Sequence, residues 1–320
     1  MGRRTHTALI PLADKLLRRA MSDNPAVITV NDPDDPRIAA FMDVRERDLT
    51  GRQGGFMIES AFVLDIALKQ DRIGVDAVLI SAHKAGKLAN QISMALARGA
   101  DVYVAEQEVM DAITGFHIHR GVLAFGRKPQ APGLDDAVAA MSDADGPLLV
   151  AADISNHDNV GAIFRNAAAF GASGVLLDAR CCDPFYRKAI RVSAGHVLTT
   201  PFRHGDDINA ILDALERRGV TPIALSPSGA ADIRSFSAPH PRALVLGAEG
   251  PGLPASVLAR CETVRIPMAA GVDSLNVATA AAVALSHMMQ PGGFTPAGDA
   301  HYTGRSGLAA RSSNARRSRP

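Results

Sequence analysis

The sequence predicts an α/β fold in which a C-terminal α/β domain with a mostly parallel sheet follows a smaller α/β domain. Short β-branched runs alternate with helical patterns from residue 26 onward, and a segment rich in proline and glycine interrupts them at 127–147. The chain has 320 residues, and single domains usually have about 100–200. Its apolar fraction of 47% and charged fraction of 21% are those of a globular protein with a core.

The first domain is predicted to span residues 26–126, after an N-terminal extension of residues 1–25. The expected strands are 26–30, 55–58, 75–80, 101–104 and 121–125, and the expected helices are 59–70 and 88–98. Strands and helices that alternate in this way favour a sheet covered by helices.

Residues 127–146 are assigned to a linker with room for one short helix, because prolines and glycines cluster there. The second domain, 147–290, repeats the alternation. Its expected strands are 148–152, 174–177, 220–225, 242–246 and 263–266, and its expected helices are 160–170, 208–218 and 276–289. Helical crossovers between strands imply a mostly parallel sheet. Residues 291–320, rich in Gly, Ser and Arg, are predicted to form a basic disordered tail.

The net charge of the chain does not indicate a polyanionic partner, because 34 Lys and Arg are balanced by 33 Asp and Glu. A nucleic-acid site must therefore come from local clusters. Arginines gather at both ends of the chain, where they could equally form solubilising tails. These arginines are Arg3, Arg4, Arg18 and Arg19, and Arg305, Arg311, Arg316, Arg317 and Arg319.

Cysteine usage favours a reducing, cytoplasmic location. Cys181 and Cys182 are adjacent and Cys261 stands alone, a spacing that offers neither a disulfide framework nor a metal site. The N-terminus lacks the uninterrupted apolar core of a signal peptide, and no segment is long and apolar enough to cross a bilayer. We therefore expect no membrane partner.

A first polar motif covers residues 156–171, after the first strand of the second domain. Asn159 is a candidate N-cap, and Arg165 follows six residues later, less than two turns along the predicted helix. Taken alone, the segment is more typical of an ordinary capped helix with a solvated arginine.

A second motif, residues 244–254, places Glu249 among Gly247, Gly250 and Gly252, which allow the backbone to approach a ligand closely. The spacing matches neither G-x-G-x-x-G nor a phosphate-binding loop, which counts against a nicotinamide dehydrogenase, one alternative function.

A third motif, residues 266–281, leads through a Pro/Gly loop to Ser274 and Asn276 at the start of an Ala-rich helix, where free backbone N–H groups suit an anion. All three motifs follow predicted strands, and ligands of open α/β sheets bind at such ends.

In this order the three segments resemble the motifs of the TrmH (SpoU) family of RNA 2′-O-ribose methyltransferases, in the SPOUT superfamily. The resemblance covers about residues 147–290, and residues 183–195 are similar to the family's middle segment. Asn166 stands where a threonine is common. In the first domain, residues 48–52, 55–60 and 115–124 are similar to the family's RNA substrate-binding domain.

The resemblance implies a SPOUT domain with a deep trefoil knot, a homodimer with each site completed at or near the subunit interface, and methyl transfer from S-adenosylmethionine to a ribose 2′-hydroxyl of rRNA or tRNA. It implies five polar site residues, Asn159, Arg165, Glu249, Ser274 and Asn276. It implies a cofactor pocket formed by Leu246, Gly247, Gly250, Gly252, Ile266, Met268, Ser274 and Leu275. We expect no metal.

Arg165 is proposed in the family to take the hydroxyl proton, yet a guanidinium normally stays protonated in proteins. We expect Arg165 to orient the hydroxyl and pair with an RNA phosphate, and Ser274 to hold phosphate. Two alternatives are methylation of a guanine ring nitrogen, which favours an acidic base, and a non-catalytic RNA-binding protein.

His117 and His119 lack a third metal ligand, so contact with RNA or solvent is favoured. With aromatic residues at 4%, RNA recognition should depend on shape, phosphates and 2′-hydroxyls.

Overall fold

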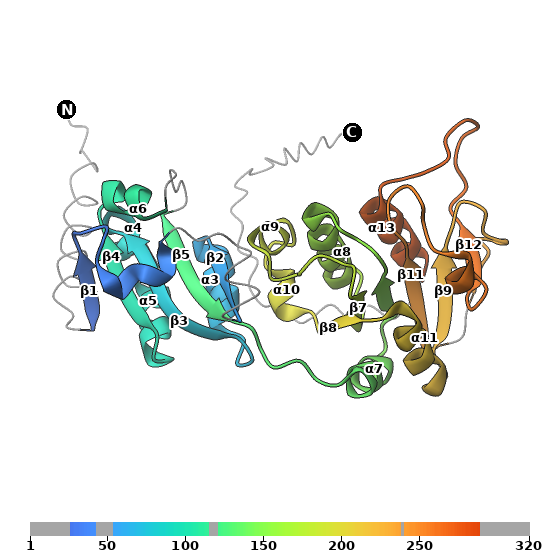
Figure 1. Ribbon diagram of the computed structural model, residues 1–320, viewed down its shortest axis with the longest axis horizontal. Helices are drawn as coiled ribbons and strands as arrows, with labels where there is room; N and C mark the ends of the chain where they lie inside the picture. Colours follow the sequence, from blue (N-terminus) through green and yellow to red (C-terminus); the bar gives the residue numbers. More distant parts are fainter. Residues whose placement is uncertain (1–25, 43–53, 115–120, 238–239, 289–320) are drawn as a thin grey trace, which may run out of the picture. The chain divides into compact units, whose positions relative to one another are not determined.

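The computed structural model describes residues 26–42, 54–114, 121–237 and 240–288, which form two β-sheets with helices on both faces (Figure 1). The predicted N-terminal extension, the basic tail, the motif at 48–52 and the two histidines at 117 and 119 lie outside the described residues. None of the helices in the described ranges is long and apolar enough to span a membrane.

The first sheet has the strand order β1-β4-β3-β5-β2 and mixes parallel with antiparallel pairs. Its strands are β1 (Val27–Val30), β2 (Gly55–Glu59), β3 (Gly74–Ser81), β4 (Asp101–Ala105) and β5 (Val122–Arg127). The pairs β1–β4 and β3–β4 are parallel, whereas β5 runs antiparallel to both β3 and β2. All five strands match predicted ones.

Side chains on alternate positions of the first sheet enter two separate cores. Phe56 and Ile58 pack with the helices α3 (Ala61–Leu68) and α5 (Ala89–Ala97). Met57 packs on the other face with the 3₁₀ helix η1 (Pro36–Phe41) and with α6 (Gln107–Thr114). The short elements α4 (Ala82–Ala85) and η2 (Gly86–Leu88) lead into α5. Because strand side chains alternate between faces, one five-residue strand supports both layers.

The second sheet has the order β10-β12-β9-β11-β6-β7-β8, and every adjacent pair is parallel. Its strands are β6 (Leu148–Ala151), β7 (Gly174–Asp178), β8 (Phe202–Asp206), β9 (Thr221–Leu225), β10 (Ala231–Asp232), β11 (Arg242–Leu246) and β12 (Glu262–Arg265). The predicted mostly parallel sheet is confirmed. The edge strands β8 and β10 were not predicted.

Helices cover both faces of the second sheet, as a parallel sheet requires. On one face, α8 (His157–Ala169) and α13 (Val277–Met288) lie side by side (Figure 1), with α9 (Arg187–Val192) and α10 (His196–Thr199) packed against α8. On the other face lie α7 (Leu134–Ser142), α11 (Ile208–Arg217) and α12 (Ala255–Leu258).

The segment 127–146, predicted as a linker, contains α7, and this helix belongs to the core of the second sheet. Val138 and Met141 are buried against Leu148 and Leu212. A Cβ atom added at Gly174 would lie 2.4 Å from the Met141 sulfur, so the helix packs directly on β7. Only the residues before α7 are therefore free to act as a connection.

Candidate active site

Four loops that leave adjacent parallel strands meet at one edge of the second sheet. These loops follow β12, β9, β11 and β6, which are neighbours in the sheet. The first and third polar motifs begin in the loops after β6 and β12, and the second begins within β11 and continues through the loop after it. Their predicted position at the carboxyl ends of strands is confirmed. Ligands of open α/β sheets bind at this edge.

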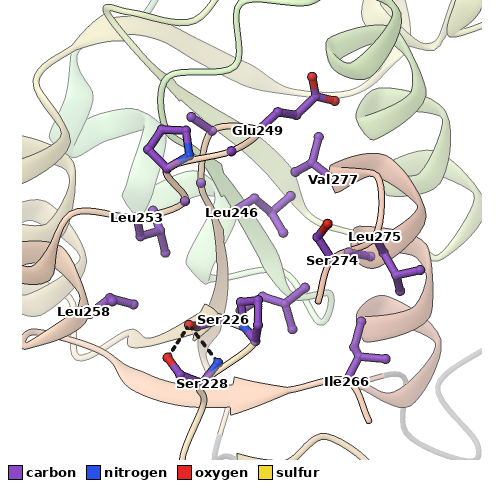
Figure 2. A pocket seen from close by; sticks show the side chains of 18 of the residues that line it. Ser226, Ser228, Leu246, Glu249, Leu253, Leu258, Ile266, Ser274, Leu275 and Val277 are labelled. Carbon is purple, nitrogen blue, oxygen red and sulfur yellow. Dashed lines mark hydrogen bonds between the residues drawn. The ribbon is translucent and has the colours of Figure 1, made fainter. Parts of the chain in front are cut away.

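A cavity of about 440 Å³ opens between the loops after β9, β11 and β12 and the start of α13 (Figure 2). All eight residues expected to bind the cofactor line it. The other described residues that line it are mostly apolar, and Glu249 is the only charged one that the structure describes there. The volume lies within the usual range for small-molecule sites, about 300–1,000 Å³.

Sequence reasoning missed the loop after β9, which forms a further wall of the cavity. Ser226 and Ser228 line it, with their hydroxyl oxygens 3.1 Å apart (Figure 2). A Ser-Pro-Ser turn is common in loops, so its spacing carries no signal of a ligand. Only its place beside β11 in the sheet reveals the contribution.

The three glycines of the second motif serve different purposes. A Cβ atom at Gly247 would lie 2.6 Å from the backbone of both Gly252 and Leu253, so the loop closes tightly on itself there. The Gly252 N–H donates to the carbonyl of Ala248 at 3.1 Å. Gly250 and Gly252 have φ angles of +87° and +67°, which L side chains rarely adopt. The wall formed by this loop therefore depends on glycine for both space and conformation.

Three of the expected site residues form one hydrogen-bonded cluster, Asn159, Glu249 and Asn276. The Asn276 Oδ1 caps α13 by accepting from the N–H groups of Ala278 and Thr279, at 3.0 and 3.2 Å. Its Nδ2 then donates to Asn159 Oδ1 at 2.9 Å and to Glu249 Oε1 at 3.3 Å. Asn159 is buried and also donates to Glu249 Oε1. The cluster ties the glycine loop to both α8 and α13.

The prediction that Asn159 caps α8 is wrong. The N-cap is Asn156, whose Oδ1 accepts from the N–H of Asp158 at 2.9 Å. Asn159 is the third residue of the helix. Two asparagines three residues apart are both plausible caps by type, and the earlier one begins the helix. This leaves the Asn159 amide available for Glu249.

The structure does not bring Arg165 to the cluster. Six residues of α-helix turn about 600°, so Arg165 and Asn159 point in directions about 120° apart. Arg165 is exposed and, within the described part of the chain, has no hydrogen bond or ion pair with the cluster. Burial lowers the pKa of His196, and the charge of Arg165 lowers it further. The charge of Arg165 is therefore felt by His196 of α10, on the side of α8 that faces α10.

Ser274 lies at the cavity wall, apart from the hydrogen bonds of the cluster. Its hydroxyl donates to the Asp273 carboxylate at 3.3 Å, and its side chain is exposed (Figure 2). Of the five expected polar site residues, the structure thus joins three, places Ser274 on the same cavity as Glu249, and leaves Arg165 on another face of α8.

Buried polar groups shape the loop between β6 and α8. The Asp178 carboxylate accepts from the N–H groups of Asp153 and Cys181, both at 3.0 Å. The Cys181 sulfur accepts from Ile154 N–H at 3.3 Å and donates to Ala151 O at 3.2 Å. Burial raises the pKa of Cys181 well above its usual range and that of Cys182 to about 11. These thiols therefore stay protonated at neutral pH.

Replacing Asn159 with aspartate is expected to lower the free energy of unfolding at about pH 8 by about 1–3 kcal/mol, because the donor to Glu249 is lost. The new carboxylate would also face the Glu249 carboxylate, so one of the two pKa values in the variant should rise. A raised pKa in the folded state favours folding at low pH. The loss should therefore shrink at about pH 5, as measured by urea unfolding.

Asn156→Asp is the matched control, because it adds the same charge three residues earlier, where aspartate caps a helix as well as asparagine does. It should change the free energy of unfolding by less than about 0.5 kcal/mol. Equal losses in both variants, or a loss in Asn159→Asp that does not depend on pH, would contradict the role assigned to the cluster.

Among the described residues, no group of three or more His, Cys, Asp or Glu side chains converges as a metal site would.

Comparisons with known proteins give the fold and the site a family. The SpoU rRNA methylase family matches residues 146–286. An uncharacterized tRNA/rRNA methyltransferase of Mycobacterium bovis is 37% identical over 281 residues, which cover 84% of this chain and 94% of that protein. A second such protein, from Mycobacterium tuberculosis, is 36% identical over the same shares.

Solved structures of RNA methyltransferases have a similar fold. The AdoMet-bound rRNA methyltransferase of Sinorhizobium meliloti aligns with a TM-score of 0.70 and 24% identity over 82% of this chain and 97% of that one. An RNA 2′-O ribose methyltransferase aligns with a TM-score of 0.62 and 25% identity over 81% and 97%. The fold is therefore that of the SPOUT methyltransferases. With a relative at 37% identity over most of both chains, the protein belongs to the SpoU family of RNA methyltransferases.

Proposed function

We propose that the protein transfers the methyl group of S-adenosylmethionine to a ribose 2′-hydroxyl of structured rRNA or tRNA. The observation that carries the proposal is the carboxylate of Glu249, held by two side-chain amides on the wall of a cavity whose other described lining residues are uncharged. The names of the mycobacterial relatives point to tRNA or rRNA, and one structural neighbour is a ribose 2′-O methyltransferase.

The chemistry of the cavity fits S-adenosylmethionine. The cofactor combines a flat adenosine, which suits apolar walls and backbone polar groups, with a sulfonium cation, which suits a single nearby carboxylate. Leu246, Gly247, Ile266, Met268 and Leu275 supply such walls and backbone groups, and Glu249 supplies the carboxylate. The bound cofactor would provide the methyl group.

The cluster supports ribose rather than base methylation. Methylation of a guanine ring nitrogen needs a carboxylate that can accept the ring proton. The Glu249 Oε1 already accepts hydrogen bonds from Asn159 and Asn276, so this carboxylate is committed to holding the loop. We propose that the cluster shapes the cavity and that Ser274, at its wall, holds an RNA phosphate.

A guanidinium stays protonated at neutral pH, so Arg165 is a poor acceptor for the hydroxyl proton. We propose instead that Arg165 orients the 2′-hydroxyl and pairs with an RNA phosphate, and that this phosphate assists loss of the hydroxyl proton. The exposed Arg165 and the cluster lie on different faces of α8. A homodimer would reconcile this geometry with a shared site, because Arg165 of one protomer could reach the cavity of its partner.

The test uses the full chain, isotopically labelled S-adenosylmethionine, and separate rRNA and tRNA pools from cells that lack the gene. After digestion, mass spectrometry of the nucleosides should find the label in a 2′-O-methylnucleoside from one pool. Label in a base-methylated guanosine would support the ring-nitrogen alternative. Cofactor binding without transfer to either pool would support a non-catalytic RNA-binding protein.

A further inference from the structure

A second cavity, of about 470 Å³, lies between the start of α3 and the end of α9 and shares no described lining residue with the cavity of the candidate active site. Phe62, Lys84 and Arg191 contribute side chains to it, from α3, α4 and α9. Among the described residues that line it, none is acidic. The open groove therefore combines an aromatic ring with two cationic groups.

Phe62 is the most exposed large apolar side chain in the described part of the chain, at 63%. The apolar face of α3 is already filled by Val63, Leu64, Ala67 and Leu68, all of which are buried. Phe62 points away from that face, so its ring does not contribute to the core. The two other exposed large apolar residues, Val272 and Leu275, lie in the loop that leads to α13.

Arg191 differs from its neighbours on α9 in having no acidic partner among the described residues. Arg187 forms an ion pair with Glu59 at 2.6 Å, and Lys188 forms one with Asp158 at 2.7 Å. Arg191 is exposed beside the cavity. Its charge is therefore available to an anionic ligand.

The backbone of the groove is constrained. Three non-glycine residues in the described part of the chain have a positive φ, and two of them, Ser60 at +106° and Ala194 at +52°, line this cavity. Residues held in such conformations concentrate at binding sites. Next to the cavity, α3 packs closely against the turn that follows α9, since a Cβ atom at Gly195 would lie 2.9 Å from Ile66 Cδ1. The groove is therefore preformed.

We propose that this groove binds one unpaired RNA nucleotide, with its base stacked on Phe62 and its phosphate between Lys84 and Arg191. Stacking on an aromatic ring and pairing with phosphate are how proteins hold single-stranded RNA without reading its sequence. An acidic peptide would pair with Arg191 and leave the phenyl ring of Phe62 without a flat partner. The inference rests on the proposed action on RNA, and it identifies an unpaired nucleotide as part of the substrate.

The test measures fluorescence anisotropy of the full chain with two labelled probes, a short oligoadenylate and a blunt RNA duplex. Phe62→Ala should weaken oligoadenylate binding about tenfold or more. Binding of the duplex should stay within about twofold, because its bases are already stacked. Phe62→Tyr keeps the ring and should bind oligoadenylate like the parent protein.

Arg191→Gln should lower the slope of log affinity against log salt for oligoadenylate by about one, the mark of one lost phosphate contact. Arg218→Gln removes the same charge at the end of α11 and should leave the slope unchanged. Thermal unfolding should not change in Phe62→Ala, since the ring is exposed.

Absence of oligoadenylate binding by the parent protein at low salt would overturn the proposal, and so would equal binding by Phe62→Ala. Phe62-dependent binding of polyglutamate in place of oligoadenylate would assign the groove to an acidic peptide. The readout is binding, so it is separate from the proposed function. If ribose methylation fails while oligoadenylate binding depends on Phe62, only the proposed function falls.

Discussion

Gly247→Ala is expected to lower the affinity for S-adenosylhomocysteine by about tenfold to a hundredfold, because overpacking of about 1–3 kcal/mol must be relieved in the loop that lines the cavity. The added methyl group would lie 2.6 Å from backbone atoms of Gly252 and Leu253. Backbone cannot rotate away as a flexible side chain can, so the loop itself must shift. Isothermal titration calorimetry of both proteins measures the change.

Gly219→Ala is the matched control. Gly219 has a φ of +65° with open space around it, so alanine there is strained by about 1–2 kcal/mol without touching another group. Gly219 lies between the end of α11 and the start of β9. It is therefore at the amino-terminal edge of the parallel sheet, whereas the loops that line the cavity leave the carboxyl ends of the strands. This variant should lose stability and keep its affinity for S-adenosylhomocysteine. Parent-like affinity in Gly247→Ala would show that the glycine loop is not a wall of the cofactor site.

The elements that could be predicted from sequence are those whose local pattern matches their burial. Strand β11 was predicted with its observed bounds, because all five of its residues are buried. The edge strand β8 was missed, since Phe202 is its only large apolar residue. Helix α6 was also missed, because its polar residues obscure the buried Met110 and Ile113. Edge and half-exposed elements are held by tertiary contacts that a local pattern does not contain.

In the candidate site, too, local sequence patterns identified residues but not the long-range contacts between them. Motif positions named the residues of the cluster, but not the hydrogen bonds that join Asn159 to Glu249 across 90 positions of sequence. Spacing also cannot decide which of two asparagines begins α8, and therefore which one is free to face the glycine loop. The contribution of Ser226 depends on the order of strands in the sheet, which follows from long-range pairing.

Arg165→Ala is expected to lower methyl-transfer turnover by at least about a hundredfold, the lower end of what a positioned proton-transfer group contributes, while cofactor affinity stays within a few-fold. The side chain is exposed, so stability should not change. The pKa of His196 should rise, because a repelling charge is removed, and NMR titration would report it. Arg165→Lys keeps the charge without the planar fork. Turnover near the parent rate in Arg165→Lys would indicate that the arginine pairs with phosphate. Turnover as low as in Arg165→Ala would indicate that the planar fork orients the hydroxyl.

For the proposed homodimer, mixing two variants tests whether Arg165 serves the cavity of its own protomer or that of its partner. A protomer with Arg165→Ala keeps its cavity, and a protomer with Gly247→Ala keeps its arginine. The assay uses S-adenosylmethionine near the Kd of the parent protein, where the cavity of Gly247→Ala stays almost empty. If Arg165 acts across the interface, one site of each mixed dimer is complete, and random mixing of the two variants should restore about a quarter of the parent rate. If it acts within one protomer, mixing restores nothing. Near-parent single-turnover methylation by Arg165→Ala alone, at saturating RNA and cofactor, would remove the arginine from the mechanism.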